Sequence, residues 1–152
     1  MSPQDFQLRP VRVTDLPTLK RWRSLPEVQS HLRHPSTSWA DHLKWFLRIQ
    51  RDPTCRVWAV VYGDQLVGQA GLYYKMGPAA EVSLVVFAGE KEAFTAERVA
   101  LRELEYAALR WGVTTLWAEV LSTAPLQRHT VFPPASMIWA DTYSTIYRWS
   151  LA

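Results

Sequence analysis

The sequence predicts one α/β domain with a mixed β-sheet. Short runs of alternating apolar residues indicate strands, and longer stretches with apolar residues at helical spacing indicate helices. In one stretch a buried strand, a helix and another strand follow one another, which is a βαβ unit with parallel strands. No linker, repeat or low-complexity tract divides the 152 residues, so a single domain over residues 1–152 is expected.

The N-terminal third is expected to form one strand and two helices. Residues 7–13 alternate as a strand, and Thr14 after them is a residue type that caps helices. The first helix is expected over residues 15–24 because its apolar side chains follow helical spacing. A second helix is expected after Ser38, whose hydroxyl can accept from the free amides of the first turn. Its apolar residues are Trp39, Leu43, Phe46, Leu47 and Ile49.

A hairpin and a central strand come next. Residues 56–62 and 65–74 alternate as strands, and the dipeptide Gly63-Asp64 between them supplies the turn. Residues 76–78, Met-Gly-Pro, break the second strand. Residues 81–87 are apolar on both faces, which is typical of a strand at the centre of a sheet.

The C-terminal half completes the βαβ unit. A long amphipathic helix is expected over residues 95–111, and a strand over residues 115–121 that lies parallel to residues 81–87. Residues 123–131 are expected to form no more than one helical turn. Residues 136–151, rich in Trp, Tyr and Ile, are expected to form two further strands.

Charge, cysteine content and hydropathy limit the function classes. The net charge of +3 permits an anionic ligand, but Lys and Arg are spread along the chain, so no nucleic-acid partner is expected. Cys55 is the single cysteine, which excludes an internal disulfide and fits a buried structural thiol in a reducing compartment. No apolar run reaches the roughly 18 residues of a membrane span and no signal-peptide pattern is present, so a soluble cytoplasmic protein is expected.

Motifs for covalent or metal-dependent catalysis are missing from the sequence. There is neither a serine elbow nor a Cys-His pair. His31 and His34 have the spacing of metal ligands, but no cysteine or carboxylate nearby completes a site, so no metal is expected.

Three stretches carry a family resemblance that covers nearly the whole chain. They are LRPVRVTDLPTLKRWRSLPEV at residues 8–28, HLKWF at residues 42–46, and VWAVVYGDQLVGQAGL at residues 57–72, with a "VG" step at Gly68. Their order resembles the GNAT superfamily of acetyl-coenzyme-A-dependent N-acetyltransferases, in the branch of the ribosomal-protein-alanine acetyltransferases. The resemblance implies a mostly antiparallel central sheet with one parallel, splayed pair of strands, flanked by helices.

The resemblance implies acetyl-coenzyme A as the acyl donor. In the family, free backbone amides on the splayed central strand hold the pantetheine arm, which here points to main-chain contacts at Leu84, Val85 and Val86. The family's pyrophosphate turn carries Gln or Arg, two residues, Gly, one residue, and Gly or Ala, at a helix N-terminus. The segment that aligns with this turn consists of Glu92, Ala93, Phe94, Thr95, Ala96 and Glu97.

This turn departs from the family pattern. Glu92, Thr95 and Glu97 occupy the three motif positions, although glycine is what permits a close backbone approach and a carboxylate repels pyrophosphate. Lys91 and Arg98 could offset that repulsion. Two interpretations remain open: a degenerate but real cofactor site, or acidic residues that only stabilise the start of a helix.

Catalysis in the family is direct attack of a deprotonated amine on the thioester, which needs a base and oxyanion donors. Glu81 is the candidate base, because this branch often has a glutamate near the acceptor amine; the alternative is a strand-edge charge facing solvent. The family's Asn, helix and thiolate-protonating Tyr are missing from residues 121–132. His129 is the nearby titratable substitute, with an ordinary surface histidine as the alternative, and water can also supply the proton.

Trp22, Arg23 and Trp45 are candidates to line the acceptor cleft, with packing in the core as the alternative. Two functions are therefore considered. The first is an acyl-coenzyme-A N-acyltransferase that acts on a primary amine of a small molecule or of a protein N-terminus. The second is a GNAT-fold binding protein with a degenerate cofactor site, which dimerises through its aromatic C-terminal strands. Neither nucleic acid nor membrane is an expected partner.

Overall fold

A central sheet organises the chain, and the computed structural model describes it in residues 5–30, 38–86, 90–124, 129–133 and 136–151. Within those residues the sheet has seven strands in the order β1-β2-β3-β4-β5-β7-β6. The strands are β1 (Phe6–Pro10), β2 (Arg56–Tyr62), β3 (Gln65–Met76), β4 (Ala79–Val86), β5 (Thr115–Leu121), β6 (Met137–Ala140) and β7 (Ser144–Ser150). Only β4 and β5 pair in parallel among these strands; the other neighbours are antiparallel. The predicted mixed, mostly antiparallel sheet is confirmed.

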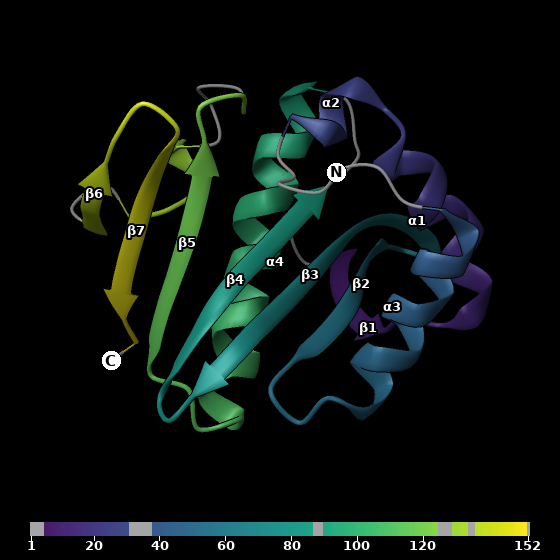
Figure 1. The fold of residues 1–152 in the computed structure, drawn as a ribbon, viewed down its shortest axis with the longest axis horizontal. Helices are drawn as coiled ribbons and strands as arrows, with labels where there is room; N and C mark the ends of the chain where they lie inside the picture. The colour runs from purple at the N-terminus through teal and green to yellow at the C-terminus, as the bar shows by residue number, and fades with distance from the viewer. Residues whose placement is uncertain (1–4, 31–37, 87–89, 125–128, 134–135, 152) are drawn as a thin grey trace.

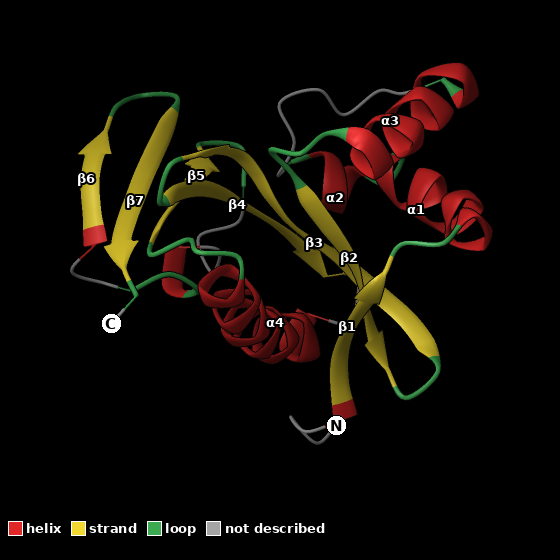
Figure 2. Cartoon of the chain, turned by 90° about the horizontal axis from the view of Figure 1, so that it is seen from below, coloured by secondary structure: helices red, strands yellow, loops and turns green. Residues whose placement is uncertain are grey.

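Helices cover both faces of the sheet. They are α1 (Leu16–Arg23), α2 (Pro26–Gln29), α3 (Trp39–Arg51) and α4 (Glu90–Arg110), with a 3₁₀ turn η2 over Val13–Asp15. Figure 2 shows α1, α2 and α3 on one face and α4 on the other. The chain therefore folds as three layers, and each face of the sheet has its own core.

The larger core lies between the sheet and α4. Along β4, Val82, Leu84 and Val86 are buried, and the residues between them are half-buried, which is the period-2 pattern of a strand. Small residues on α4, such as Ala96 and Ala100, let the helix lie close to these side chains. The side chains of β4 that alternate with them point to the other face, where α1, α2 and α3 lie.

The N-terminal prediction was partly wrong. The strand ends at Pro10 rather than at residue 13, and Thr14 lies inside the 3₁₀ turn instead of capping a helix. Asp15 shapes this turn because its carboxylate accepts two hydrogen bonds from Arg9, at 2.7 and 2.8 Å, and one from the Arg12 amide at 2.8 Å. The short helix α2 was not predicted.

The second helix begins as predicted. Ser38 caps α3, its hydroxyl accepting from the Asp41 amide at 3.1 Å. Several of the apolar residues that predicted this helix do not lie in the core: Trp39, Leu43 and Leu47 are between 45% and 53% exposed. The side chains that α3 buries most deeply are those of His42 and Ile49.

The hairpin and the C-terminal strands confirm the prediction. Gly63 takes a φ of +59° in the turn between β2 and β3, a conformation that glycine adopts without strain. β3 continues two residues beyond the expected end, to Met76. The last two strands are present. The final strand, β7, pairs with both β5 and β6 and so lies between them in the sheet. Cys55 is buried, and burial, with Asp52 adding to it, raises the pKa of its thiol.

The long helix starts five residues earlier than predicted. It begins at Glu90 rather than residue 95, so the segment 92–97 is helical and is not a turn that precedes the helix. The sequence Glu-Lys-Glu-Ala from residue 90 is rich in helix-forming residues, and acidic residues favour the first turn. Phe87, expected to end the central strand, and Gly89 lie outside the described residues.

Candidate active site

The parallel pair β4 and β5 opens along its length. Only Ala79, Ala80 and Glu81 of β4 pair with β5, opposite residues 115–117, although both strands continue for several residues. Figure 1 shows the two strands meeting near the start of β4 and diverging toward its end, with α4 crossing behind them. The predicted parallel and splayed pair is therefore confirmed.

The splay leaves backbone groups of β4 without a neighbouring strand. In a strand the N–H and C=O groups point alternately to the two sides, and β3 takes one side of β4 through Val86. On the side of β5, the ladder of β4 ends at Glu81, although β4 continues to Val86. Leu84 and Val86 bury their side chains in the core with α4, which leaves only their main-chain groups to face the opening.

An irregularity in β3 lies opposite the start of β4, the part that pairs with β5. The β3–β4 register shifts between Tyr73 and Met76, opposite the start of β4, and Tyr74 there has a φ of +53°. A bulge of this kind re-aims the neighbouring side chains. This register shift is in the antiparallel ladder between β3 and β4, not between the splayed strands β4 and β5.

A small pocket lies on the face of the sheet that α1, α2 and α3 cover. Its volume is about 70 Å³, which has room for a group the size of a carboxylate. It is lined by Leu19, Trp22, Arg23, Val28, Trp45, Gln69, Tyr73, Ser83 and Val85. We call it the Arg23 pocket. The structure thus brings together all three residues that were predicted to line the acceptor cleft.

Strand register explains why β3 and β4 contribute to this pocket. Ser83 and Val85 are two residues apart on β4 and so share a face. Gln69 lies directly opposite Val85, and Tyr73 directly opposite Glu81, so these side chains point to the same face. Sequence reasoning missed Gln69, Tyr73 and Ser83, because only the pairing of β3 with β4 brings them beside the helices.

Tyr73 forms a polar centre in the pocket wall. Burial raises the pKa of its phenol to about 12, although hydrogen bonds with the side chains of Trp45 and Gln69 act in the opposite direction. Gly71 makes room for the ring, since a Cβ at Gly71 would lie 2.5 Å from Tyr73 Cε2. The hydroxyl is therefore neutral near neutral pH and is available as a hydrogen-bonding group.

Arg23 provides the charge of the pocket. Burial lowers the pKa of its guanidinium, which Tyr73 partly offsets, and the side chain still stays protonated at neutral pH. Among the described lining residues there is no carboxylate. The pocket therefore combines one cation with aromatic walls and the polar side chains of Gln69, Tyr73 and Ser83.

His42 supports the pocket from behind. Its ring stacks on that of Trp45, with 5.3 Å between centroids and 18° between planes, and only 2% of its surface is exposed. Burial, together with the positive charges of Arg23 and Lys20, lowers the pKa of His42, although a hydrogen bond to the Leu16 backbone opposes this. Sequence reasoning passed over His42, since a lone histidine on a helix gives no signal of its role.

Glu81 stands where the parallel pair opens. It is the last residue of β4 that pairs with β5, and it shares the pocket-side face with Ser83. On β5, Trp117 lies opposite Glu81 and is the last residue that pairs with β4. Glu119 is two residues further along β5, so it lies on the same face of the sheet as Trp117 and Glu81. Glu119 is a second carboxylate at the opening, which sequence reasoning did not single out. Both are engaged in interactions within the structure.

The segment 92–97, which aligns with the family's pyrophosphate turn, lies within α4. Only the first four amides of a helix are free, so those of Thr95, Ala96 and Glu97 are used by the helix itself. Ala96 and Glu97 are also buried. An anion bound by the free amides of α4 would therefore lie at the first helical turn, which includes Glu92. It would not lie at Thr95, Ala96 and Glu97.

His129 is half-buried and contacts a tyrosine of the C-terminal strand. Its Nδ1 lies 2.8 Å from the hydroxyl of Tyr147, a residue of β7 whose ring packs on Phe132. Burial raises the pKa of the Tyr147 phenol. This pair follows β5 in the chain and lies on the α4 side of the sheet, where Tyr147 joins the main core.

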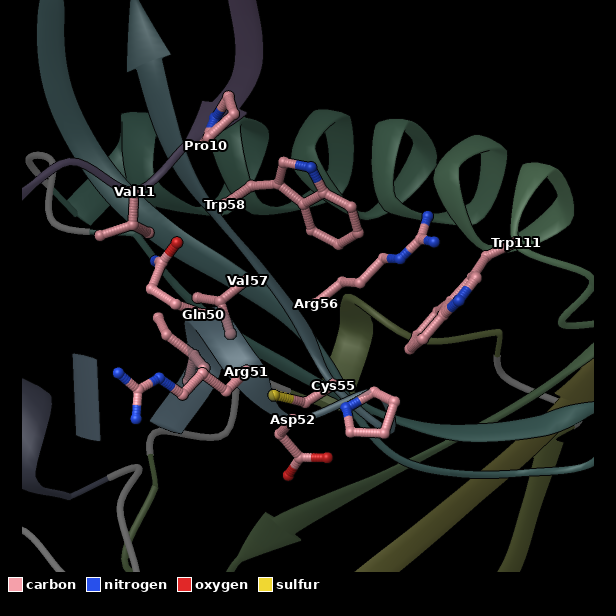
Figure 3. A pocket seen from close by; sticks show the side chains of 12 residues that line it. Pro10, Val11, Gln50, Arg51, Asp52, Cys55, Arg56, Val57, Trp58 and Trp111 are labelled. Carbon is pink, nitrogen blue, oxygen red and sulfur yellow. The ribbon is translucent and has the colours of Figure 1, made fainter. Parts of the chain in front are cut away.

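A larger groove of about 630 Å³ lies at the other end of the sheet. Figure 3 shows Arg56 pointing toward Trp111, and the guanidinium carbon is 4.5 Å from the ring centroid. Trp111 directly follows α4, so this groove adjoins the end of α4 that is opposite its N-terminus. Its lining includes no residue of β4 or β5, so the groove is separate from the opening between them.

The described residues include neither a metal-binding cluster nor a membrane-spanning helix. No group of three or more His, Cys, Asp and Glu side chains there could hold a metal ion. None of the described helices combines the length and the apolar character needed to cross a membrane. His31 and His34, the pair with metal-like spacing, lie outside the described residues.

A mostly antiparallel sheet with one splayed parallel pair, flanked by helices on both faces, is the architecture of a GNAT-type acyltransferase. Residues 5–125 match the family described as "Acetyltransferase (GNAT) domain", so the chain belongs to this family. No curated protein sequence matches the chain at a significant level.

Solved structures share the fold at low sequence identity. The spermidine N-acetyltransferase of Vibrio cholerae, in complex with CoA and spermine, superposes with a TM-score of 0.81 at 12% identity, covering 97% of this chain and 96% of that one. An acetyltransferase of Thermus thermophilus gives 0.75 at 21% identity, covering 99% and 100%. The N-acetyltransferase PseH of Campylobacter jejuni, in complex with acetyl coenzyme A, gives 0.73 at 13% identity, covering 97% and 99%.

Proposed function

We propose that this protein is an N-acetyltransferase that moves the acetyl group of acetyl-coenzyme A to a primary amine of a small molecule or of a protein N-terminus. The observation that carries the proposal is the loss of β4–β5 pairing beyond Glu81, directly beside the Arg23 pocket. The opening offers backbone donors to an extended thioester, and the pocket offers a neighbouring place for the acceptor. Membership of the GNAT family supports the same reaction.

The mechanism follows from these two features. Among Leu84, Val85 and Val86, the main-chain groups that face the opening bind the pantetheine arm and polarise the thioester carbonyl. Glu81 removes a proton from the acceptor amine, directly or through water, and the amine nitrogen attacks the carbonyl carbon. The carbon–sulfur bond breaks, and the coenzyme A thiolate takes a proton from water. No covalent acyl-enzyme is formed.

The proposal includes a degenerate pyrophosphate site. The opening stretch of residues 8–28 supports a place in the ribosomal-protein-alanine acetyltransferase-like branch, whereas the start of α4 lacks that branch's glycines. The amides of its first turn hold the pyrophosphate against the repulsion of Glu92. We further place the protein in the cytoplasm, where acetyl-coenzyme A is available, with neither nucleic acid nor membrane as a partner.

A binding protein without catalysis is the second candidate. One observation favours it: β6 is an edge strand, and Met137, Ile138 and Trp139 are each between 57% and 59% exposed. Exposed apolar side chains on an edge strand favour pairing with another chain. In this case two copies associate through β6, and the opening between β4 and β5 holds no thioester.

Thermal unfolding with coenzyme A species separates these candidates. A ligand at 100 times its Kd adds about 2.7 kcal/mol to the stability of the native state, or roughly 5–10 °C in Tm for a domain of this size. Acetyl-coenzyme A should give such a shift, and adding an amine acceptor should then release thiol. No shift at millimolar acetyl-coenzyme A, together with a dimer by sedimentation, would support the binding protein.

A further inference from the structure

We propose that the exposed side of α3 is a docking surface for an acidic amphipathic helix of another protein. The inference goes beyond the proposed function and does not depend on it, because acetyl transfer is assigned to the opening between β4 and β5 and this surface lies on α3. It concerns binding only and involves no chemical step.

Three large apolar side chains form a row along α3. Trp39, Leu43 and Leu47 are 50%, 45% and 53% exposed, and they follow one another at intervals of four residues. Residues four apart on a helix are neighbours on its surface, so the row is continuous. Single exposed apolar residues are ordinary, whereas a continuous row marks an interaction surface. We call this row the α3 seam.

The seam is separate from the face with which α3 packs on its own domain. Leu43 and Leu47 directly follow two residues of that face and so lie about 100° further around the helix. The helix therefore has a wider apolar surface than its packing in this domain uses. The residues of the packed face are His42, Trp45, Phe46 and Ile49.

Basic side chains flank the seam. Lys44, Arg48 and Arg51 are exposed and follow one another at intervals of four and three residues, so they form a second row along α3. Lys20 of α1 adds positive charge at the start of the seam, where its Nζ lies 5.3 Å from the centroid of the Trp39 ring. A partner that covers the seam meets these charges at its edges, so acidic side chains there favour binding.

The width of the seam favours a helix over a lipid surface. The seam is one residue wide and roughly 12 Å long from Trp39 to Leu47, at 1.5 Å of rise per residue. A narrow apolar stripe of this kind is the contact surface of paired helices, whereas a helix that lies in a membrane surface presents a broad apolar face. The occupant is therefore an amphipathic helix.

Charge argues against a second copy of this chain as the occupant. A symmetric pair centred on Leu43, in the middle of the seam, would bring the two copies of Lys44 together, where like charges repel. Asp41, in the first turn, is the one acidic residue of α3. The complementary partner is consequently a different protein that supplies the acidic side chains.

The seam leads into the groove of about 630 Å³. Gln50 follows Leu47 by three positions, so it continues the seam, and it lines the groove together with Arg51. Figure 3 shows these two side chains on one side of the groove and Trp58 and Arg56 on the other. A helix on the seam would reach this groove with its next turn, and the groove has room for its side chains.

Two synthetic peptides of about 18 residues, long enough to form helices, test the inference. Both carry leucines at intervals of three and four residues; one has glutamates and the other lysines at the flanking positions. Fluorescence anisotropy of the labelled peptides measures binding. The glutamate peptide should bind with a micromolar Kd, about tenfold or more tighter than the lysine peptide, and more weakly as salt rises. Equal binding of the two peptides, or no binding of the glutamate peptide at millimolar concentration, would overturn the inference.

A pair of apolar substitutions assigns the binding to the seam. Leu43→Gln with Leu47→Gln should weaken binding of the glutamate peptide about tenfold or more. Tyr106→Gln with Leu109→Gln is the matched control, because these α4 residues are 53% and 42% exposed and lie outside the seam. Urea unfolding checks that both variants are folded. Unchanged binding by the seam variant contradicts the inference.

A charge reversal tests the basic row. Lys44→Glu with Arg48→Glu should invert the preference, so that the lysine peptide binds more tightly than the glutamate peptide. Arg102→Glu with Arg110→Glu makes the same change of charge at exposed positions of α4 and should keep the original preference. A preference that follows net charge alone, inverted in both variants, would overturn a specific surface on α3.

The other occupants give distinct results. Vesicles of equal parts phosphatidylcholine and phosphatidylserine that bind the wild type, but not Leu43→Gln with Leu47→Gln, would assign the seam to lipid. A dimer in sedimentation that the same variant abolishes would assign it to a second copy. Either result overturns the inference. Loss of acetyl transfer by the wild type would instead count against the proposed function alone.

Discussion

Gly71 lies directly beneath the ring of Tyr73, and a Cβ added at Gly71 would come within 2.5 Å of the ring atom Cε2. Because real Cβ atoms do not approach so closely, any other residue at position 71 must move the ring. The ring forms part of the Arg23 pocket and hydrogen-bonds with Trp45 and Gln69. A backbone feature of β3 thus sets the shape of a site formed by side chains.

Replacing Gly71 with alanine should therefore damage the pocket more than the fold. We expect Gly71→Ala to raise the acceptor KM about tenfold, while acetyl-coenzyme A affinity changes little, because the added methyl displaces Tyr73. Gly63→Asn in the hairpin turn is the control, as nothing lies within 4 Å of a Cβ there and asparagine tolerates its positive φ. Steady-state kinetics on both variants decide; an unchanged KM in Gly71→Ala contradicts the expectation.

Glu81 is the proposed base at the opening between β4 and β5. Glu81→Gln should lower turnover by roughly 10² or more at neutral pH with little effect on acetyl-coenzyme A affinity, because the amide cannot accept the proton. The control is Glu119→Gln, which removes the second carboxylate of the same face. Turnover is measured from pH 6 to 9. If Glu81→Gln keeps full turnover across this range and Glu119→Gln does not, the roles are reversed.

The start of α4 makes a separate prediction about the cofactor. Glu92 lies in the first turn of this helix, where a negative charge repels a pyrophosphate, so Glu92→Gln should tighten acetyl-coenzyme A binding severalfold. Thr95 is already beyond the first four amides, so Thr95→Gly should cost roughly 0.5–1 kcal/mol of stability without gain in affinity. Glu103→Gln, which makes the same charge change in the middle of α4, is the control. Titration calorimetry that finds equal affinity for wild type and Glu92→Gln would oppose a pyrophosphate at this turn.

Strand periodicity and turn residues made most of the fold predictable from sequence. The alternation in β2 and β3 and the glycine between them define the hairpin without any tertiary information. The start of α4 was mispredicted because the family pattern was aligned on the helix body, whereas the local residues from Glu90 already favour a helix. At this position the helix propensity of the local residues indicates the helix start better than the alignment with the family pattern does.

The candidate site was predictable only in part. Trp22, Arg23 and Trp45 come from two helices and were found through the family resemblance. Tyr73 and Gln69 were not found, because their neighbours are set by the pairing of β3 with β4, and no local pattern encodes that register. Long-range register and helix packing therefore account for what sequence reasoning missed.

Asp15 and Arg9 form the ion pair that holds the 3₁₀ turn before α1. Burial on its own raises the pKa of Asp15, but hydrogen bonds from Arg9 and from the Arg12 amide outweigh it, so the pKa lies below its usual value. The stabilisation is therefore complete above the unfolded-state pKa of about 3.9 and is lost as pH falls below it. Asp15→Asn should cost about 1.5–3 kcal/mol near pH 7 and less near pH 3. Urea unfolding of this variant, with Asp64→Asn in the exposed hairpin turn as control, tests this; a cost independent of pH would contradict it.

His42 gives the last prediction, which concerns acid stability of the layer that carries the pocket. Its pKa is lowered by burial and by the charges of Arg23 and Lys20, so the folded state binds its proton less readily than the unfolded chain. The stabilisation by neutral His42 is therefore complete above the unfolded-state pKa of about 6.5 and is lost as pH falls below it. His42→Phe keeps a ring against Trp45 and removes the titration, so its free energy of unfolding should fall less than that of the wild type between pH 7 and pH 5. Arg23→Gln should reduce the wild-type fall in part, because it removes one of the charges that act on His42. Urea unfolding at a series of pH values measures all three proteins, and parallel pH profiles for wild type and His42→Phe would show that His42 does not control acid stability.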